Sequence, residues 1–322
     1  MTADPSVSIA FVIPVRNDAV RLGRCLESIV RNDYPRSSIE LLVVDNDSTD
    51  TSDHVARTYA DAVVKLSGMS VAALRNRGAR ETRASIIAFV DADHEIDRHW
   101  VTSAVTTLSD ADVGAAGFPY ETQPDPSWVQ RLYDAMRSRP ESRRSVAWLG
   151  SGNLVVKREC FNAVGGFRED LIASEDVDLC NRLTRAGYSI TADPGMRSTH
   201  YGDPRTLRAL FLGELWRGRD NIKVTFGGPR TFRHLRSALV PIVDLVCIAG
   251  GVAVLLVGRP LYALTFWFLP LIPAMLRAAF IYRKLQDRSP MAWAKALVVA
   301  SVFDLARALA LVIPGSHRAR RA

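Results

Sequence analysis

The sequence predicts an α/β fold with a mostly parallel sheet and helices on both faces, followed by C-terminal transmembrane helices. Three observations predict it. Short apolar, β-branched runs alternate with segments of helical periodicity through the N-terminal part of the 322 residues, a pattern typical of βαβ units. Acidic clusters follow two of these runs. From about residue 238 onward the apolar stretches become long enough to cross a membrane.

The first element is expected at 8–15, SIAFVIPV, because an apolar, β-branched run that stops at a polar turn is typical of a buried parallel strand. A helix at 19–30 follows, since its apolar residues recur at near-helical spacing and Pro35 lies in the turn after it. The later strands are expected at 39–44, 62–66, 85–90, 113–120 and 154–156. The later helices are expected at 51–59, 71–83, 98–108, 128–138 and 175–186.

Asp91 and Asp93 end the strand expected at 85–90. Residues two apart on an extended segment project from the same side. Two hard oxygen ligands on one side are suited to Mg²⁺ or Mn²⁺, with coordination positions left for diphosphate oxygens and water. The alternative is a plain turn, because Asp is common where a strand stops.

Two further acidic clusters have a structural and a functional interpretation. Asp45 and Asp47 follow the strand at 39–44, where a carboxylate can accept a hydrogen bond from a ribose or a base; alternatively, Thr49 or Asp50 caps the next helix. Glu175-Asp176-Val177-Asp178 begins an expected helix, where acidic residues favour the helix dipole. A carboxylate within reach of a sugar hydroxyl is also the usual general base.

Several short strings occur together in a specific order. They are Val12-Ile13-Pro14-Val15-Arg16-Asn17, Tyr34-Pro35, Val43 to Asp50, Arg75-Asn76-x-Gly78-Ala79, Phe89 to Asp93, Gly165-Gly166-Phe167, Glu175 to Leu179, Arg182-Leu183 and Gly187-Tyr188. In their order and spacing the chain resembles a family 2 glycosyltransferase of the GT-A fold, of the inverting, membrane-anchored bacterial type. The resemblance covers about residues 7–200.

The resemblance implies roles residue by residue. Pro14, Asp45, Asp47, Arg75 and Asp91 match positions that bind the nucleotide sugar, with Asp45 on the base and Arg75 near the phosphates. Asp91 is shared between ribose and metal, Asp93 is the direct metal ligand, and His200 falls where some relatives place a further one. Asp176 matches the catalytic base of inverting members, with Glu175 as its neighbour.

The resemblance also implies the reaction: a metal-dependent, single in-line displacement that moves a sugar from a nucleotide-diphosphate sugar to a lipid-linked or glycan acceptor, with Mg²⁺ or Mn²⁺ as cofactor. The Q-x-x-R-W motif of the family's processive synthases is absent near Trp216-Arg217, which favours transfer of one sugar. Two alternatives remain open: a processive exopolysaccharide synthase, and an inactive membrane-bound scaffold of the same fold.

The net charge of +7 does not indicate a nucleic-acid partner, because the basic residues flank the apolar stretches. Such flanks are expected beside anionic lipid head groups. They are Arg205, Arg208, Arg217, Arg219, Lys223, Arg230, Arg233 and Arg236 before the stretches and Arg318, Arg320 and Arg321 after them. The four cysteines lack metal-binding or paired spacing, which predicts reduced thiols. The first residues show no basic region typical of a cleaved signal.

The chain is therefore divided into three predicted parts: a catalytic domain at 1–204, an amphipathic interfacial segment at 205–236 and a membrane region at 237–322. Spans are expected at about 238–257 and 261–282, with a third apolar helix at 292–313 that lies at the interface or re-enters, since a third full span would place the C-terminal arginines outside. The expected location is the cell membrane, multi-pass, with the catalytic domain cytoplasmic and membrane lipids as partners.

Overall fold

The computed structural model describes residues 8–228 and 232–313. These residues form two compact units. The first comprises residues up to 123, 138–171 and 175–202, and the second comprises 124–137, 172–174 and the chain from 203 onward. Residues 124–137, which the sequence-based division leaves inside the catalytic domain, thus pack with the second unit. Arg230, Arg318, Arg320, Arg321 and the first seven residues, on which the charge and signal predictions partly rest, lie outside the described residues.

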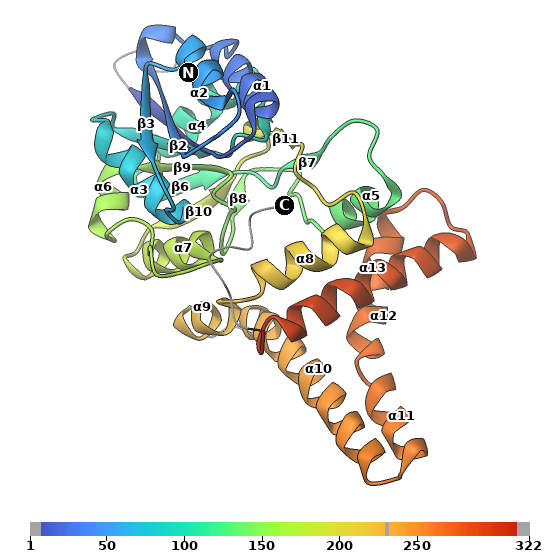
Figure 1. Ribbon diagram of the computed structural model, residues 1–322. Coiled ribbons are helices and arrows are strands. Elements are labelled where there is room, and N and C mark those ends of the chain that lie inside the picture. Colours follow the sequence, from blue (N-terminus) through green and yellow to red (C-terminus); the bar gives the residue numbers. More distant parts are fainter. Residues whose placement is uncertain (1–7, 229–231, 314–322) are drawn as a thin grey trace. The chain divides into compact units, whose positions relative to one another are not determined.

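The first unit is built on an eight-stranded sheet in the order β3-β2-β1-β4-β9-β6-β10-β8 (Figure 1). Its strands are β1 (Ile9–Val15), β2 (Ile39–Asn46), β3 (Ala62–Leu66), β4 (Ile86–Val90), β6 (Val113–Gly117), β8 (Arg144–Ser145), β9 (Asn153–Lys157) and β10 (Ser189–Ala192). The pairs β1–β2, β1–β4, β2–β3 and β6–β10 are parallel, and β9 runs antiparallel to both of its neighbours. The predicted mixed, mostly parallel sheet is confirmed.

Helices and a second, smaller sheet complete this unit. The helices are α1 (Ala19–Val30), α2 (Ser52–Tyr59), α3 (Val71–Glu81), α4 (Trp100–Leu108), α6 (Arg158–Ala163) and α7 (Glu175–Arg185). The small sheet has the order β5-β11-β7, from β5 (His94–Ile96), β7 (Glu121–Thr122) and β11 (Ser198–His200). The strands of the small sheet are too short to show periodicity in the sequence. In the large sheet, the strand expected at 113–120 stops at Gly117, two residues before Pro119, which has no N–H to donate to a neighbouring strand.

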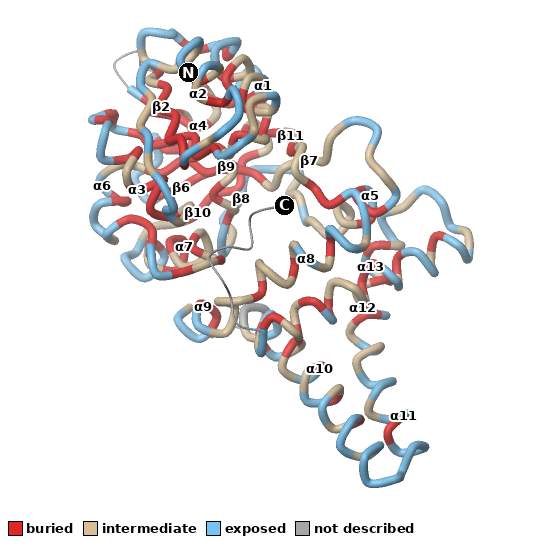
Figure 2. The backbone as a smooth tube through the Cα atoms, viewed as in Figure 1, coloured by how far each residue is buried: buried red, intermediate tan, exposed pale blue. Residues whose placement is uncertain are grey.

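The core of the first unit lies between the large sheet and its helices. Every residue of β1 is buried, as are all residues of β4, and Figure 2 shows the central strands as the most buried part of this unit. The largest fully buried side chain is Trp100, whose ring lies 5.5 Å from that of Phe11. The continuous burial explains why these strands are apolar without alternation: both faces of the sheet are covered.

The second unit is helical. It contains α5 (Trp128–Ala135), α8 (Leu207–Arg217), α9 (Asn221–Gly227), α10 (Phe232–Leu256), α11 (Pro260–Phe268), α12 (Leu271–Lys284) and α13 (Pro290–Leu309). α10 and α11 run side by side as a hairpin, and Gly251 lies against the Trp267 indole there, so close that an added Cβ would overlap it. A charged cluster joins α5, α8 and α13. Glu214 of α8 accepts hydrogen bonds from Arg307 of α13 (2.7 Å) and from the Tyr133 hydroxyl of α5 (2.7 Å).

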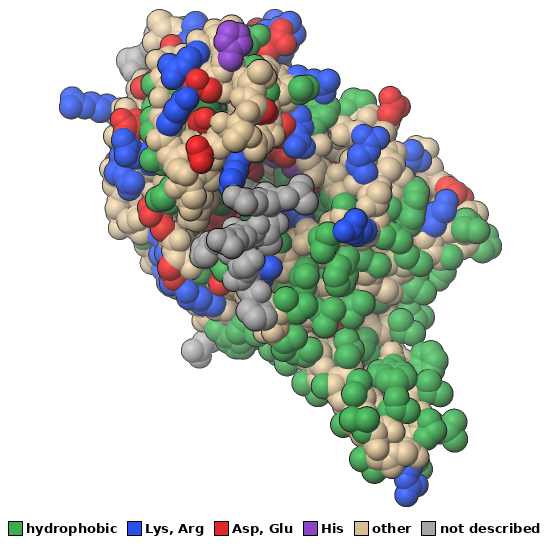
Figure 3. Space-filling view, in the orientation of Figure 1, with side chains coloured by type: hydrophobic (Ala, Val, Ile, Leu, Met, Phe, Trp, Pro, Cys, Tyr) green, Lys and Arg blue, Asp and Glu red, His purple; other side chains and the backbone are tan. Residues whose placement is uncertain are grey.

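Two stretches of this unit are long and apolar enough to cross a membrane, Leu235–Leu256 and Pro260–Lys284, the latter comprising α11 and α12. Only 22% and 17% of their apolar windows are buried, so they are not core helices of the usual kind. Figure 3 shows hydrophobic side chains gathered over this hairpin. Among the described residues, α13 is not one of the helices apolar enough to cross a membrane. It carries two charged side chains that form ion pairs: Asp304 accepts from Arg277, and Arg307 donates to Glu214.

Candidate functional site

The predicted site residues gather where parallel strands of the first unit end. β1, β2 and β4 are adjacent and parallel, so their carboxyl ends share one edge of the sheet, the usual position of ligand sites in such folds. Pro14 lies buried near the end of β1, opposite Val44, and Asp45 is paired with Val15 on the neighbouring strand. Asp91 directly follows β4.

The loop after β2 is held in place by its own carboxylates. Asp45 is almost fully buried and its Oδ1 accepts from the Ser48 N–H at 3.1 Å. Asp50 accepts from the first N–H of α1, on Ala19, and from the first N–H of α2, on Ser52. The capping interpretation therefore holds for Asp50. Asp47 is exposed, has a φ of 61° and bonds the Ser67 hydroxyl.

Arg75 joins two acidic clusters that lie far apart in the sequence. Its side chain projects from α3 and is 3% exposed, with Nη1 at 2.7 Å from Glu175 Oε1 and Nη2 at 2.5 Å from Asp91 Oδ1. The guanidinium also lies 5.6 Å from the centre of the Phe167 ring. Arg75 thus holds the carboxylate at the end of β4 and the carboxylate at the start of α7 in one arrangement.

Asp93, His94 and His200 form the one group among the described residues that has the composition of a metal site. One ligand atom from each lies within 4.8 Å of the others. The small sheet produces this arrangement, because β5 and β11 pair antiparallel with His94 directly opposite His200. His200 Nε2 lies 3.3 Å from Asp93 Oδ2, and the two imidazole rings are 4.7 Å apart.

The surroundings fit a divalent cation. Although burial alone would raise the pKa of Asp93, His200, His94 and Arg21 hold that pKa far below its usual range, so the carboxylate is ionised. His94 Nδ1 lies 3.1 Å from the Ser198 hydroxyl, which leaves Nε2 as the ligand when Nδ1 carries the hydrogen. Gly202 closes the cluster: a Cβ there would fall 2.1 Å from Asp93 Oδ2 and 2.8 Å from His200 Nε2.

Glu175 and Asp176 begin α7 beside the loop that precedes β9. Glu175 accepts from Arg75 and, at 3.4 Å, from the Ser151 hydroxyl. Burial, together with the charge of Glu175, raises the pKa of Asp176 to about 7. A Cβ added to Gly152 of the same loop would meet Asp91 Oδ2 at 2.8 Å. A buried carboxyl group whose pKa is raised in this way is typical of acid–base sites.

The structure therefore brings together two groups of the predicted residues. Asp91, Arg75 and Glu175 form one bonded chain, with Asp176 next in sequence, and Asp93 and His200 form another. Pro14, Asp45 and Asp47 lie at the same sheet edge, and within the described part of the chain they make no hydrogen bond or ion pair to either group. The sequence reasoning missed His94. The only feature of the sequence that indicates His94 is its position directly after Asp93. His94 lies beside His200 because β5 and β11 pair, and these strands are far apart in the sequence.

Comparison with known proteins identifies the family of this part of the chain. Residues 10–168 match the model of glycosyl transferase family 2. This part of the chain is a family 2 glycosyltransferase domain. The residues that carried the resemblance up to Phe167 fall inside it, while Glu175, Asp176 and His200 lie beyond it.

Two relatives and one solved structure extend the comparison. The chain is 33% identical over 198 residues to glycosyltransferase AglE of Haloferax volcanii, covering 58% of this chain and 64% of that protein. It is 28% identical over 199 residues to the pre-mycofactocin glycosyltransferase of Mycobacterium tuberculosis, covering 58% and 41%. The chain thus spans less than two thirds of either relative.

The structure of mannosyltransferase PcManGT from Pyrobaculum calidifontis, in complex with GDP-Man and Mn²⁺, superposes with a TM-score of 0.60 at 20% identity and covers 93% of this chain and 88% of its own. At this identity the likeness establishes the fold, which is GT-A.

Proposed function

We propose that this protein is an inverting, metal-dependent glycosyltransferase that moves a sugar from a nucleotide-diphosphate sugar to a lipid-linked or glycan acceptor. The observation that supports the proposal is the ion-paired chain Asp91–Arg75–Glu175, because Asp93 of the histidine cluster comes two residues after Asp91 and Asp176 directly follows Glu175. The family 2 domain and the GT-A fold support the same reaction class.

The roles follow from the position and charge of each group. Asp45, at the end of β2, accepts a hydrogen bond from the base of the donor. Asp176 takes the proton of the acceptor hydroxyl as that oxygen attacks the anomeric carbon from the face opposite the leaving diphosphate. The new C–O bond forms while the bond to the diphosphate breaks, so the anomeric configuration inverts. Arg75 is bonded to two carboxylates, and its contribution is to hold them.

The cation would be held by Asp93, His94 and His200, and when bound it supplies positive charge to the departing diphosphate. Two imidazole nitrogens beside one carboxylate favour Mn²⁺ over Mg²⁺, because Mg²⁺ prefers oxygen ligands. Mn²⁺ binding is measured directly by electron paramagnetic resonance on the purified protein. We expect His94→Ala and His200→Ala each to weaken it about tenfold or more, as loss of a metal contact does; affinity equal to the parent protein in both would contradict this ligand set.

The catalytic proposal is tested by incubating the detergent-solubilised protein with UDP-, GDP- and dTDP-sugars and Mn²⁺, with and without acceptor. The parent protein should consume one donor, and Asp93→Ala and Asp176→Asn should both lose activity. An inactive scaffold predicts no donor consumption by the parent and no phenotype for either variant. A processive synthase predicts products longer than one added sugar, and product length separates it from single transfer.

We propose further that the protein is a multi-pass membrane protein with its catalytic domain on the cytoplasmic side. The two apolar stretches 235–256 and 260–284, joined by a turn at Gly258, support a hairpin that starts and ends on one side. The ion-paired α13 supports a third helix that does not cross. A cysteine placed at Leu261 should react with a membrane-impermeant maleimide from outside the cell, and one at Asp287 should not; the reverse pattern would exclude this orientation.

A further inference from the structure

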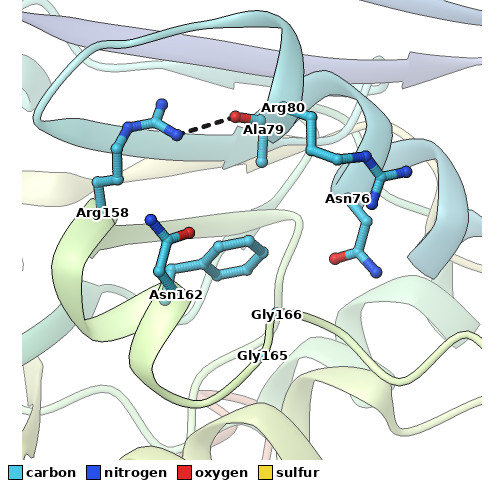
Figure 4. Close-up of a pocket in the computed structure, with 8 residues that line it drawn as sticks. Asn76, Ala79, Arg80, Arg158, Asn162, Gly165 and Gly166 are labelled. Carbon is cyan, nitrogen blue, oxygen red and sulfur yellow. Dashed lines mark hydrogen bonds between the residues drawn. The ribbon is translucent and has the colours of Figure 1, made fainter.

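A cavity of about 390 Å³ opens in the first unit, lined by α3, α6 and the turn that follows α6 (Figure 4). Its lining residues are Asn76, Ala79, Arg80, Arg158, Phe161, Asn162, Gly165 and Gly166. Two are arginines, which lie on opposite sides of the opening in Figure 4, and none is acidic. None of these residues belongs to the metal cluster or to the pair Glu175–Asp176.

Hydrogen-bond donors of this cavity remain available. Among the described residues, the side chains of Arg80 and Asn162 make no hydrogen bond or ion pair. Arg158 donates to the carbonyl oxygens of Ala79 (2.9 Å) and Ala84, and its Nη2 is buried without a partner. A buried guanidinium nitrogen without a partner is costly, and its charge is offset when an anion lies close by.

The cavity shares a wall with the support of the donor site. Asn76 lines it and clamps the backbone of Phe167, accepting from the Phe167 N–H at 2.9 Å and donating to its carbonyl at 2.8 Å. The Phe167 ring in turn lies against Arg75, which precedes Asn76 on α3. Gly166 is pressed against the same wall: a Cβ there would fall 2.8 Å from Asn76 Oδ1. A ligand in the cavity that moves the Asn76 side chain would therefore also move Phe167 and, through its ring, the guanidinium of Arg75.

We propose that this cavity binds a small phosphate-bearing anion between Arg80, Arg158 and Asn162, and that its occupancy is coupled through Asn76 and Phe167 to the site organised by Arg75. The volume admits a diphosphate together with bound water. Nearby carboxylates oppose the anion: Glu169 accepts from Asn76 Nδ2 at 2.8 Å, and the charge of Glu40 acts on Arg158. Removal of the Glu169 charge should strengthen binding.

The binding claim is tested by isothermal titration of pyrophosphate into the full-length protein in detergent with EDTA, which removes divalent cations from the Asp93 cluster. Arg80→Glu should weaken binding about tenfold or more, since it removes a charge-assisted hydrogen bond to the anion and adds a negative charge to the lining. Arg83→Glu makes the same charge change just beyond the end of α3, outside the lining, and should stay within about twofold, as expected of an exposed charge outside the site. Glu169→Gln should bind more tightly than the parent protein.

Asp93→Asn is the control for pyrophosphate that binds at the metal cluster instead of in this cavity. It should leave the affinity for pyrophosphate in EDTA unchanged. Absence of binding, or equal loss in Arg80→Glu and Arg83→Glu, would overturn the proposal. Because the titration contains no donor and no metal, its outcome is independent of the proposed transferase activity. Coupling, which rests on that activity, is tested by repeating the titration with Mn²⁺ and GDP or UDP: affinity should change about fivefold or more, and an unchanged value refutes the coupling.

Discussion

Replacement of Arg75 by Met should destabilise the first unit strongly, because Arg75 is the cation that lies between two carboxylates. Its side chain is 3% exposed; that of Glu175 is 9% exposed and that of Asp91 35%. Breaking a buried ion pair by removing one partner costs about 3–5 kcal/mol. The pair with Glu175 accounts for most of this, since water screens the partly exposed Asp91.

The loss is measurable by differential scanning fluorimetry of the detergent-solubilised protein. For domains of about 150–250 residues, 1 kcal/mol shifts Tm by about 2–4 °C, so Arg75→Met should lower the transition of the first unit by about 6–20 °C. Arg83→Met removes an exposed arginine a few residues further on and serves as the matched control, with a shift of less than about 2 °C expected from a surface change.

A double variant identifies the cause. In Arg75→Met/Glu175→Gln the carboxylate that lost its partner is neutral, so part of the lost stability should return, and the two changes should be non-additive. The reasoning is refuted if Arg75→Met unfolds within about 2 °C of the parent protein, the range of a surface change, or if the second substitution adds its own loss. In Arg75→Met alone, Glu175 still raises the pKa of Asp176 and Arg75 no longer lowers it, so the acidic limb of the activity profile should move to higher pH.

Three further predictions follow from the same contacts. Because the pKa of Asp176 is raised to about 7 and the base acts when ionised, kcat/KM should be constant above pH 7 and fall about tenfold per pH unit below it; a flat profile between about pH 5 and 8 would exclude Asp176 as the base. Gly202→Ala should displace Asp93 and weaken Mn²⁺ binding about tenfold or more, whereas Gly23→Ala, where a Cβ makes ordinary contact with its neighbour, should not; equal affinities would contradict this packing. Glu214→Ala should remove the carboxylate that Arg217 and Arg307 share in the second unit and cost about 3–5 kcal/mol, measured as lower thermal stability in detergent; an unchanged transition would show that the cluster contributes nothing.

Local patterns were enough to predict six of the eight strands of the large sheet, all but β8 and β10, and the sheet edge at which the candidate residues lie. Apolar runs with no alternation mark β1, β2 and β4, and the carboxylates that follow two of them fall at the sheet edge because parallel strands end there together. Pairings between distant segments were not predictable in this way. Nothing near Arg75 in the chain indicates Glu175 as its partner. The alignment of His94 with His200 is set by β5 and β11, which are too short to show periodicity.

Asp93 and Asp176 show how the proposed site can provide both a metal ligand and a base. Both are aspartates, and burial alone would raise the pKa of each. Asp93 lies beside His200, His94 and Arg21, which hold its carboxylate ionised, whereas Asp176 follows Glu175, whose negative charge adds to the effect of burial. Arg75 limits this second effect by pairing with Glu175. The positive charges around Asp93 lower its pKa and keep it ionised, whereas the negative charge beside Asp176 raises its pKa to about 7. Metal-assisted transfer to a hydroxyl requires both kinds of carboxyl group, one that stays ionised and one that exchanges a proton near neutral pH.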